Sequence, residues 1–294
     1  MPTRAAARRA TDDVIDADAV LAWGAPRLRD LPWRHTRDPW QILVSEVMLQ
    51  QTQVARVLDR WPRFLAAFAS PEACAAAPLG AVLREWQGLG YPRRARNLHA
   101  AATAVADLGR FPDDLDGLLA LPGVGPYTAR AVLAFAYEAD VGVVDTNIAR
   151  VFARVVGRRL TAREVQGLAD AAVPPGEGWW WNQALMDLGA VTCRPRPACV
   201  ACPLAVTCAW RGDPATADPA IGSAGVSGRQ ARFAGSDREA RGRLLKALGD
   251  GPVPITDAAS VMGRDEQIAA RLVTSLTGEG LVQTVGQMLT LPGT

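Results

Sequence analysis

The chain has 294 residues, a length that indicates two domains or one large domain with an appendage. Hydrophobic residues make up 49% and charged residues 21%, values close to the globular average that argue against long-range disorder and a fibrous repeat. The longest apolar run, residues 131–137, is too short to cross a bilayer, and the basic tail at residues 1–13 lacks the apolar core of a secretory signal, so we expect a soluble, cytoplasmic protein with no membrane partner.

The net charge is +2, which by itself does not indicate a nucleic-acid-binding protein. The 32 basic residues are almost all arginine, and Lys246 is the single lysine of the chain. Heavy use of Arg, Ala and Gly is typical of a GC-rich genome. Its chemical consequence is that almost no lysine is available as an amine nucleophile.

Helix signals dominate the chain up to about residue 210, and strand signals are almost absent there. A long apolar helix begins at Pro39 and is predicted to break near Pro62. Ser70 is a predicted N-cap, and Thr161 with Glu164 forms a predicted capping box before a later helix. The fold class we predict for this part is therefore all-α.

Residues 211–234 are rich in Gly, Ala, Pro, Ser and Asp, and they predict a linker. Residues 235–294 then show three helical patterns followed by a hairpin around Gly286, which is the outline of a winged helix-turn-helix. Such a module can bind DNA or dock a protein. Both roles stay open, because no basic run marks its third helix.

The stretch SEVMLQQTQ, residues 45–53, places Glu46 on a helix face with Ile42 and Leu43 behind it and Leu49 and Gln50 ahead. An acid within an apolar face loses solvation, so its pKa should rise. A carboxyl group that holds a proton near neutral pH is suited to general acid catalysis. The structural alternative is a partly exposed helix glutamate or one paired with an arginine.

The stretch LPGVGPYTA, residues 121–129, places Gly123 and Gly125 in a tight turn between two helices. Glycines let backbone N–H groups approach a phosphate closely, and the following helix adds its positive N-terminal end. The pattern is that of a helix-hairpin-helix site, which would bind a DNA backbone without reading its sequence. An ordinary helix–helix turn is the alternative.

Two further stretches each allow a functional and a structural interpretation. Asp145, in VVDTN, is either the N-cap of a helix or a carboxylate that projects into a cleft to stabilise positive charge. Tyr91, in GLGYPRRARNLH, lies beside Arg93, Arg94 and Arg96, which suits stacking on a base near a backbone. A solvated helix face with a core tyrosine is the alternative.

Five cysteines are present, and Cys74 stands alone as an expected core residue. The other four fall within sixteen residues: Cys193, Cys199, Cys202 and Cys208. In a reducing cytosol such a cluster favours a metal site over disulfides. Four thiolates can hold an iron–sulfur cluster or zinc, and the thiolates alone do not decide between them.

Together and in this order, these patterns resemble the helix-hairpin-helix DNA glycosylase superfamily and, within it, the MutY-type adenine glycosylases. The resemblance spans about residues 31–208 and rests on LPWR, SEVMLQQTQ, GLGY, RARNLH, LPGVG, VDTN, NQALMDLGA and the four cysteines. It implies two helical domains with a DNA cleft between them. One would be a six-helix barrel at residues 31–140, and the other an iron–sulfur domain at residues 1–30 and 141–210.

Carried over by position, the resemblance implies that Glu46 is the acid that protonates the adenine ring. It implies that Asp145 stabilises an oxocarbenium-like sugar, with Asn147 beside it, and that one [4Fe-4S] cluster is held by Cys193, Cys199, Cys202 and Cys208. The residues implied to contact the DNA or the flipped base are Arg34, Gln50, Gln51, Tyr91, Gly123, Gly125 and Asp187.

Tyr127 stands where bifunctional endonuclease III-like enzymes carry a lysine that forms a Schiff base with the sugar and cuts the strand. Tyrosine cannot do this, and Lys246 lies beyond the linker. The resemblance therefore implies a monofunctional glycosylase of base excision repair that removes adenine opposite 8-oxoguanine or guanine and leaves an abasic site. We expect a monomer that binds duplex DNA in the nucleoid.

Two features depart from the family pattern. The first cysteine gap is one residue shorter than usual, and residues 235–294 are too short and too helical for the Nudix-like domain that reads 8-oxoguanine in many MutY proteins. Two other functions stay open. One is a thymine glycosylase that acts on G·T mismatches, and the other is a non-catalytic iron–sulfur DNA-binding regulator.

Overall fold

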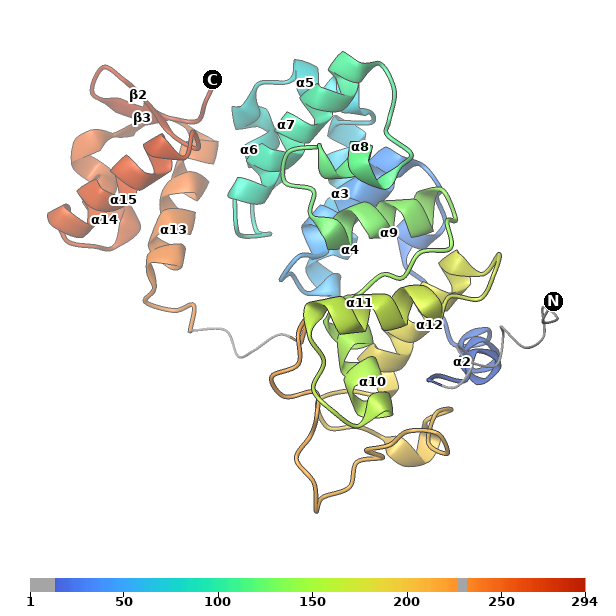
Figure 1. Cartoon of the computed structure of the whole chain (residues 1–294). Helices are drawn as coiled ribbons and strands as arrows, with labels where there is room; N and C mark the ends of the chain where they lie inside the picture. The colour runs from blue at the N-terminus through green and yellow to red at the C-terminus, as the bar shows by residue number, and fades with distance from the viewer. Residues whose placement is uncertain (1–13, 227–231, 294) are drawn as a thin grey trace. The chain divides into compact units, whose positions relative to one another are not determined.

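The computed structural model describes residues 14–226 and 232–293 (Figure 1), so the predicted basic tail at residues 1–13 lies outside the described residues. In the described part of the chain, no helix has the length and apolar character needed to span a bilayer. Backbone contacts divide the chain into a first and a second compact unit. The first unit is Met1–Pro39 with Gly125–Arg229, and the second is Trp40–Val124 with Gln230–Thr294.

The first unit is helical throughout its regular elements. In chain order these are α2 (Ala17–Gly24), a 3-10 turn (Pro32–Arg34), α9 (Pro126–Ala136), α10 (Thr146–Val156), α11 (Ala162–Ala171), α12 (Gly178–Asp187), a π-helical turn (Leu188–Thr192) and a 3-10 turn (Cys199–Ala201). The predicted capping box is confirmed, because Thr161 Oγ1 accepts from the Glu164 N–H and Glu164 Oε2 accepts from the Thr161 N–H. The predicted domain boundaries were defined by the family fold rather than by compactness, and they stay a prediction.

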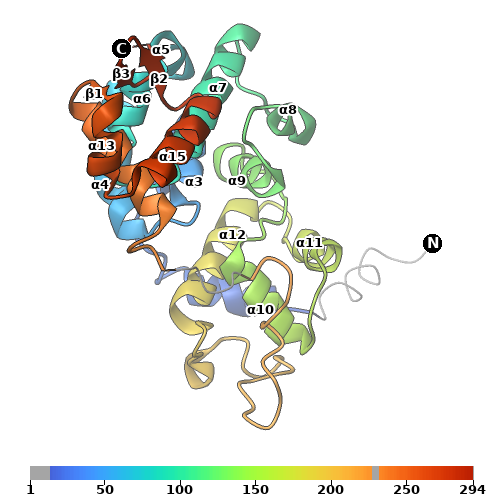
Figure 2. The same cartoon turned by 90° about the vertical axis from the view of Figure 1, so that its left-hand side faces the viewer.

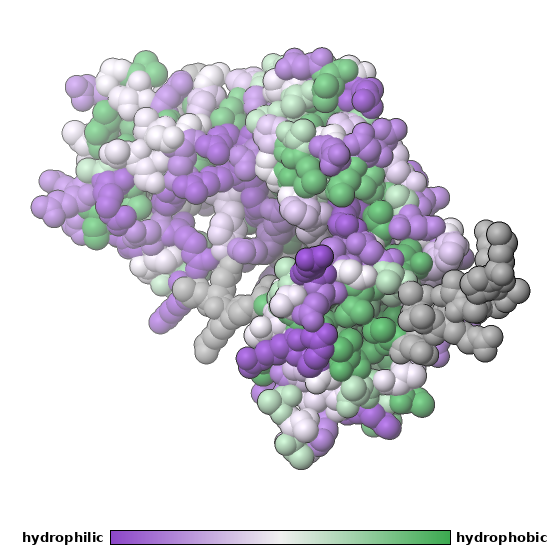
Figure 3. All heavy atoms as spheres, viewed as in Figure 1, coloured by the Kyte–Doolittle hydropathy of each residue, from purple (hydrophilic) through white to green (hydrophobic). Residues whose placement is uncertain are grey.

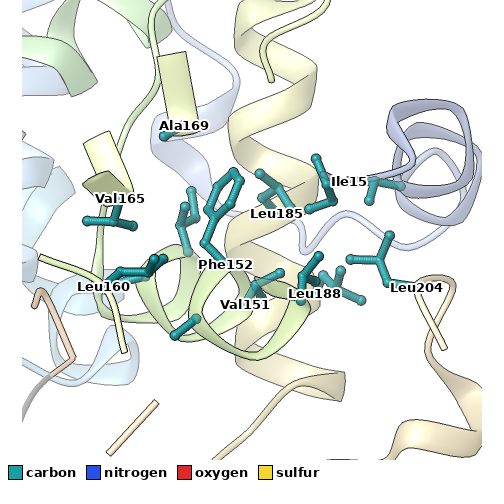
Figure 4. Packing of buried hydrophobic residues seen from close by; sticks show 14 of the residues in the cluster. Ile15, Val151, Phe152, Leu160, Val165, Ala169, Leu185, Leu188 and Leu204 are labelled. Atoms are coloured by element: carbon teal, nitrogen blue, oxygen red, sulfur yellow. The ribbon is translucent and has the colours of Figure 1, made fainter. Parts of the chain in front are cut away.

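The core of the first unit lies where α10 and α12 pack together. Phe152 from α10 and Leu185 from α12 lie in this cluster, and both are almost completely buried (Figure 4). Fully burying a side chain of this size stabilises the fold by about 1.5–3 kcal/mol. Leu204, from the cysteine-bearing segment, joins the same cluster. The apolar core therefore anchors that segment to α10.

The predicted linker is only partly a spacer. Its described residues up to 226 form no helix or strand, yet they are bonded to the first unit. The Ala224 N–H donates to the Leu160 carbonyl at 3.0 Å, and Ser223 Oγ accepts from the Leu160 N–H at 3.1 Å. Ala220 is buried against the core. Residues 227–231 lie outside the described part.

The second unit combines a helical segment with the C-terminal module. Its helices up to residue 124 are α3 (Pro39–Leu49), α4 (Val54–Ala67), α5 (Pro71–Ala76), α6 (Leu79–Glu85), α7 (Arg93–Leu108) and α8 (Leu115–Leu119). The predicted break at Pro62 is wrong, because α4 runs through Pro62 and the chain leaves the helix at residues 50–53 instead. Gln51 there has a φ of 54°. The predicted N-cap at Ser70 is confirmed.

The C-terminal module confirms the predicted three helices and hairpin. It consists of α13 (Asp237–Asp250), β1 (Val253–Pro254), a 3-10 turn (Ile255–Asp257), α14 (Ala258–Met262), α15 (Glu266–Gly278), β2 (Gln283–Val285) and β3 (Met288–Thr290). The strands form one antiparallel sheet in the order β1-β3-β2, and Leu289 pairs with Val253 and with Thr284. α13 lies beside α6 of the same unit (Figures 1 and 2).

Candidate functional site

Glu46 lies in the middle of α3, where eight of the eleven residues are buried. Only 5% of Glu46 is exposed to solvent. Its helical neighbours Ile42, Leu43 and Val47 are buried as well, as the sequence pattern predicted. The structure therefore buries the Glu46 side chain on a helix whose other buried residues are mostly apolar.

Arg94 is the residue that joins the end of α3 to the turn before α7. Its guanidinium donates to the carbonyls of Val47, Met48 and Gln50 at 2.7–3.0 Å, and to those of two residues in the turn before α7. Burial lowers the pKa of Arg94 to about 10. Of the three arginines beside Tyr91, Arg94 is thus bonded within the protein. Its side chain satisfies the free carbonyls at a helix C-terminus.

Two of the predicted DNA-contacting residues, Gln51 and Tyr91, have left-handed backbones, with φ of 54° and 48°. Residues other than glycine rarely adopt this conformation, and such strain is often found at functional sites. The hydrogen bonds of Arg94 to Gln50 and to the turn at residues 89–90 hold both loops. Gln51 is exposed, whereas Tyr91 is half-buried.

A cavity of about 270 Å³, its open mouth included, brings further predicted residues together. Gln50, Arg94, Asn97 and Gly123 contribute to its lining. The sequence places Gln50 and Gly123 far apart in the chain. The structure brings these two residues to the same surface of the second unit.

The predicted phosphate turn lies between α8 and α9, and its two glycines differ. Gly123 has a φ of 76°, and a Cβ there would lie 2.6 Å from Asn97 Cβ, so packing requires glycine. Gly125 is the N-cap of α9, and a Cβ there would meet nothing within 4 Å in the described part of the chain. The protein's own packing therefore explains Gly123 but not Gly125. Tyr127 follows in the first turn of α9 and is half-buried.

Asp145 is the N-cap of α10, as one sequence interpretation predicted. Its Oδ1 accepts from the N–H groups of Asn147 at 2.9 Å and Ile148 at 2.7 Å, and its Oδ2 accepts from Asn147 Nδ2 at 2.8 Å. Burial raises the pKa of Asp145, and these hydrogen bonds together with the charge of Arg150 oppose that rise. The carboxylate is thus desolvated and held in a fixed orientation.

A hydrogen-bonded chain links Asp145 to the first cysteine. Arg150 Nη2 donates to Asn147 Oδ1 at 2.8 Å, and Arg150 Nε donates to the Cys193 carbonyl at 2.6 Å. Gly189 permits this approach, because a Cβ there would lie 2.6 Å from Asn147 Cβ. The sequence interpretation missed Arg150. The available signal was the presence of two arginines, Arg150 and Arg154, in a helix that otherwise consists mostly of apolar residues.

Arg34 and Asp187 were predicted to contact the base, and the structure pairs them with each other. Two nitrogens of Arg34 donate to the two carboxylate oxygens of Asp187 at 2.8 and 2.9 Å, and both side chains are buried. Burial alone would raise the pKa of Asp187, but the hydrogen bonds from Arg34 and Arg29 lower it further, so the net direction is downward. This pair connects the segment before α3 to the end of α12.

The four clustered cysteines line one cavity of about 310 Å³, open mouth included. In the described residues, no three His, Cys, Asp or Glu side chains form a group that could hold a single metal ion. Four thiols that line one cavity can hold an iron–sulfur cluster or zinc. Trp210 also lines this cavity, and its buried Nε1–H finds no acceptor among the described residues.

Arg154 holds the start of the cysteine segment. It donates to the carbonyls of Cys193, Arg194 and Pro195 and to Cys193 Sγ at 3.3 Å, and it pairs with Asp218 at 2.6 Å. Burial raises the pKa of Cys202 to about 11, so a thiol here is protonated unless a metal binds it. The sequence interpretation missed both Arg154 and Asp218.

Comparisons with known proteins show what this chain is similar to. Residues 44–175 match the family model described as HhH-GPD superfamily base excision DNA repair protein. An adenine DNA glycosylase of Mycobacterium tuberculosis is 44% identical over 292 residues, which cover 93% of this chain and 92% of the relative. A solved thermostable thymine-DNA glycosylase has a TM-score of 0.66 and 31% identity, covering 70% of this chain and 99% of that one. An endonuclease III in a non-covalent DNA complex has a TM-score of 0.59 and 26% identity, covering 72% and 98%.

Proposed function

This chain belongs to the adenine DNA glycosylase family, and we propose that it acts as a monomer on duplex DNA to hydrolyse the glycosidic bond of adenine opposite 8-oxoguanine or guanine. The observation that carries the proposal is Glu46, a carboxyl group buried on the apolar helix α3. A duplex hides the glycosidic bond, so the target nucleotide must leave the base stack before the reaction.

In the proposed reaction, Glu46 donates a proton to the adenine ring, and the bond between the sugar and the base breaks with its electron pair leaving on adenine. Positive charge then develops on the sugar, and Asp145 stabilises it. The Asn147 hydrogen bonds fix the orientation of this carboxylate. Water adds to the sugar carbon and loses a proton, which leaves an abasic site.

Tyr127 supports a reaction without strand cleavage. It lies in the first turn of α9, where related bifunctional enzymes need an amine, and a phenol cannot form a Schiff base. Lys246, the single lysine, lies on α13 of the C-terminal module. We therefore expect water, rather than a protein amine, to be the nucleophile.

The backbone at Gly123 and Gly125 is the proposed phosphate contact. Gly125 needs neither a positive φ nor a close approach within the protein, and a phosphate oxygen would occupy the open space over the start of α9. Gln50, Gln51 and Tyr91 are proposed to enter or probe the duplex. The Arg34–Asp187 pair is proposed to support the base pocket through the segment that it anchors.

Cys193, Cys199, Cys202 and Cys208 are the proposed ligands of one [4Fe-4S] cluster. Their shared cavity and the acceptor-free Trp210 N–H fit sulfur atoms placed between them. When bound, the cluster would cross-link the cysteine segment through four iron–thiolate bonds. Iron and sulfide analysis of purified protein tests this, with Cys199→Ser expected to lose cluster content and Cys74→Ser expected to keep it. Equal iron content in both variants would contradict the ligand set.

A single-turnover assay on three duplexes tests the function. They hold A opposite 8-oxoguanine, A opposite G, and T opposite G, each with and without hot alkali. We expect the A strand to break only after alkali. Excision of T would favour the alternative function, a thymine glycosylase. The similarity to a solved thymine-DNA glycosylase is the reason to test that alternative. Strand breakage without alkali would contradict the interpretation of Tyr127.

A further inference from the structure

The C-terminal module does not have the surface of a DNA reader. In winged helix-turn-helix proteins the third helix enters the major groove with its N-terminal residues. Here that helix, α15, begins with Asp265 as N-cap and Glu266 in the first turn. Its one arginine, Arg271, is paired with Asp237 at 2.7 Å. The face of the module seen in Figure 3 is largely hydrophilic, but the end of α15 that would meet DNA is acidic.

The module instead contacts Tyr91. Arg238 of α13 donates from Nη1 to the Tyr91 hydroxyl at 2.8 Å, and its guanidinium lies 6.0 Å from the ring centroid. The Arg94 guanidinium lies 5.6 Å from the same centroid. The strained Tyr91 is therefore contacted by two arginines, one from α7 and one from the module.

Glu279, at the end of α15, secures the start of α7. Its carboxylate accepts from Arg93 Nε at 2.7 Å and from Arg241 Nη1 at 2.8 Å, and its carbonyl accepts from Arg96 Nη1 at 2.6 Å. The hydrogen bonds from Arg93 and then Arg241 hold the pKa of Glu279 well below its usual range. The carboxylate is only 10% exposed, so these ion pairs are partly shielded from solvent.

Two further hydrogen bonds extend this attachment to α6. The Gly80 N–H donates to the Pro292 carbonyl at 2.8 Å, and Arg84 Nε donates to the Gly249 carbonyl at 3.2 Å. The module thus holds the helices on both sides of the turn that carries Tyr91.

We propose that the C-terminal module is a brace rather than a DNA reader, and that Arg238 is a positioning residue that orients Tyr91 for entry into the duplex. This inference rests on the proposed function, which gives Tyr91 its contact with DNA. Arg93 and Arg96, interpreted from the sequence as nucleic-acid contacts, belong to the brace through Glu279.

A double-mutant cycle tests the brace. Arg238→Met keeps an unbranched apolar side chain but removes the hydrogen-bond donors, and Tyr91→Phe removes only the hydroxyl. We expect each to lower the single-turnover rate constant for adenine excision by about fivefold to tenfold, the size of one hydrogen bond. The double variant should be no slower than the slower single variant. Arg238→Lys, which can still donate to the hydroxyl, should recover part of the loss.

Arg243→Met is the matched control, because Arg243 lies on the same helix and pairs only locally with Glu239 in the described structure. It should match the wild type. Multiplicative effects in the double variant would overturn the proposal. An Arg238→Met variant that is faster than the wild type would also overturn it, because Arg238 would then hold Tyr91 back from the duplex. If Arg238 binds phosphate itself, Arg238→Met would reduce the slope of log affinity against log salt by about 0.9, and that result would also overturn it.

Hydrogen exchange separates this inference from the proposed function. Amides at residues 88–96 should exchange faster in Arg238→Met than in Arg243→Met, whatever base the enzyme removes. If the wild type fails to excise adenine, the proposed function fails while this measurement still tests the brace. Unchanged exchange at residues 88–96 would overturn the brace even in an active adenine glycosylase.

Discussion

Arg94 in the second unit and Arg154 in the first unit both tie a helix to a loop, but they bind different partners. Arg94 donates to backbone carbonyls and to the Thr52 hydroxyl, and burial lowers its pKa to about 10. Burial also lowers the pKa of Arg154, but the hydrogen bonds to Asp218 and Cys193 raise it more, so the net direction is upward. Arg94 is thus bonded mainly to the free carbonyls at a helix C-terminus, whereas Arg154 is bonded to a carboxylate.

The two candidate catalytic carboxyl groups also differ in how the structure holds them. Glu46 lies on the helix whose end Arg94 caps, among buried apolar residues. Asp145 belongs to a network of partly buried hydrogen-bonded groups that continues through Asn147 and Arg150 to Cys193. Glu46 is therefore positioned by its place on a buried helix, whereas Asp145 is positioned by the hydrogen bonds that it accepts at the start of α10.

The largest expected effect is at Glu46. Glu46→Gln keeps the volume of the side chain but cannot donate the proton, so the single-turnover rate of adenine excision should fall by about 10²–10⁴. Binding to duplex DNA should persist, because phosphate contacts and shape are unchanged. Asp107→Asn, an exposed neutralisation on α7 of the same unit, is the control and should be silent. Weak DNA binding by Glu46→Gln would count against the acid role.

Asp145→Asn should lower the same rate by about 10²–10³, because the charge that stabilises the sugar is lost while asparagine still caps α10. Its raised pKa means that the carboxyl group takes up a proton at a higher pH than an ordinary aspartate. The wild-type rate should therefore fall on the acid side as pH drops through this raised value. A pH–rate profile whose acid limb is the same in both proteins would refute the assignment.

Removing each arginine tests the comparison directly. Arg154→Met should lower the free energy of unfolding by about 3–5 kcal/mol, because Asp218 loses its partner in a partly buried site. Arg94→Met leaves only uncharged acceptors and should cost less, about 1–3 kcal/mol. Chemical denaturation measures both values. Adding Asp218→Asn to Arg154→Met should restore part of the lost stability. If Arg154→Met and Arg94→Met cost the same unfolding free energy, the proposed difference between the two arginines would be wrong.

Acid should weaken the first unit through Asp187. Its folded pKa is lower than the unfolded value of about 3.9, so its contribution to stability is present above that value and is lost as pH falls through the folded pKa. Unfolding free energies measured from pH 6 to pH 3 should decline at the acid end. Asp187→Asn, although less stable overall, should show a shallower decline. The same slope in both proteins would mean that other carboxylates control acid unfolding.

The smallest effect is expected at a site that neither arginine touches. Thr161→Ala removes the N-cap of α11 and should cost about 1 kcal/mol in unfolding free energy, with no change in excision rate. This variant gives the baseline for a purely local defect in the first unit. A loss of activity here would mean that small stability changes alone alter catalysis and would weaken every comparison above.

Local features of the molecule could be predicted from the sequence because their partners lie within a few residues. Ser70, Asp145 and Thr161 cap their helices as their positions indicated, and Gly286 turns the hairpin of the C-terminal module. A cap is decided by a side chain and the N–H groups two or three residues later. The order of the helices and hairpin followed from periodicity in the same way.

Only the tertiary structure decided the partners of the long charged side chains. Arg34 and Asp187 lie 153 residues apart, yet they form one buried pair, and Arg94 reaches α3 across more than 40 residues. Arg93 and Arg96 contact the C-terminal module although the sequence pattern suggested a nucleic-acid surface. An arginine can reach acceptors on any element packed near it, so its local sequence does not determine its partner. The fold sets that choice by deciding which carbonyls and carboxylates lose water beside it.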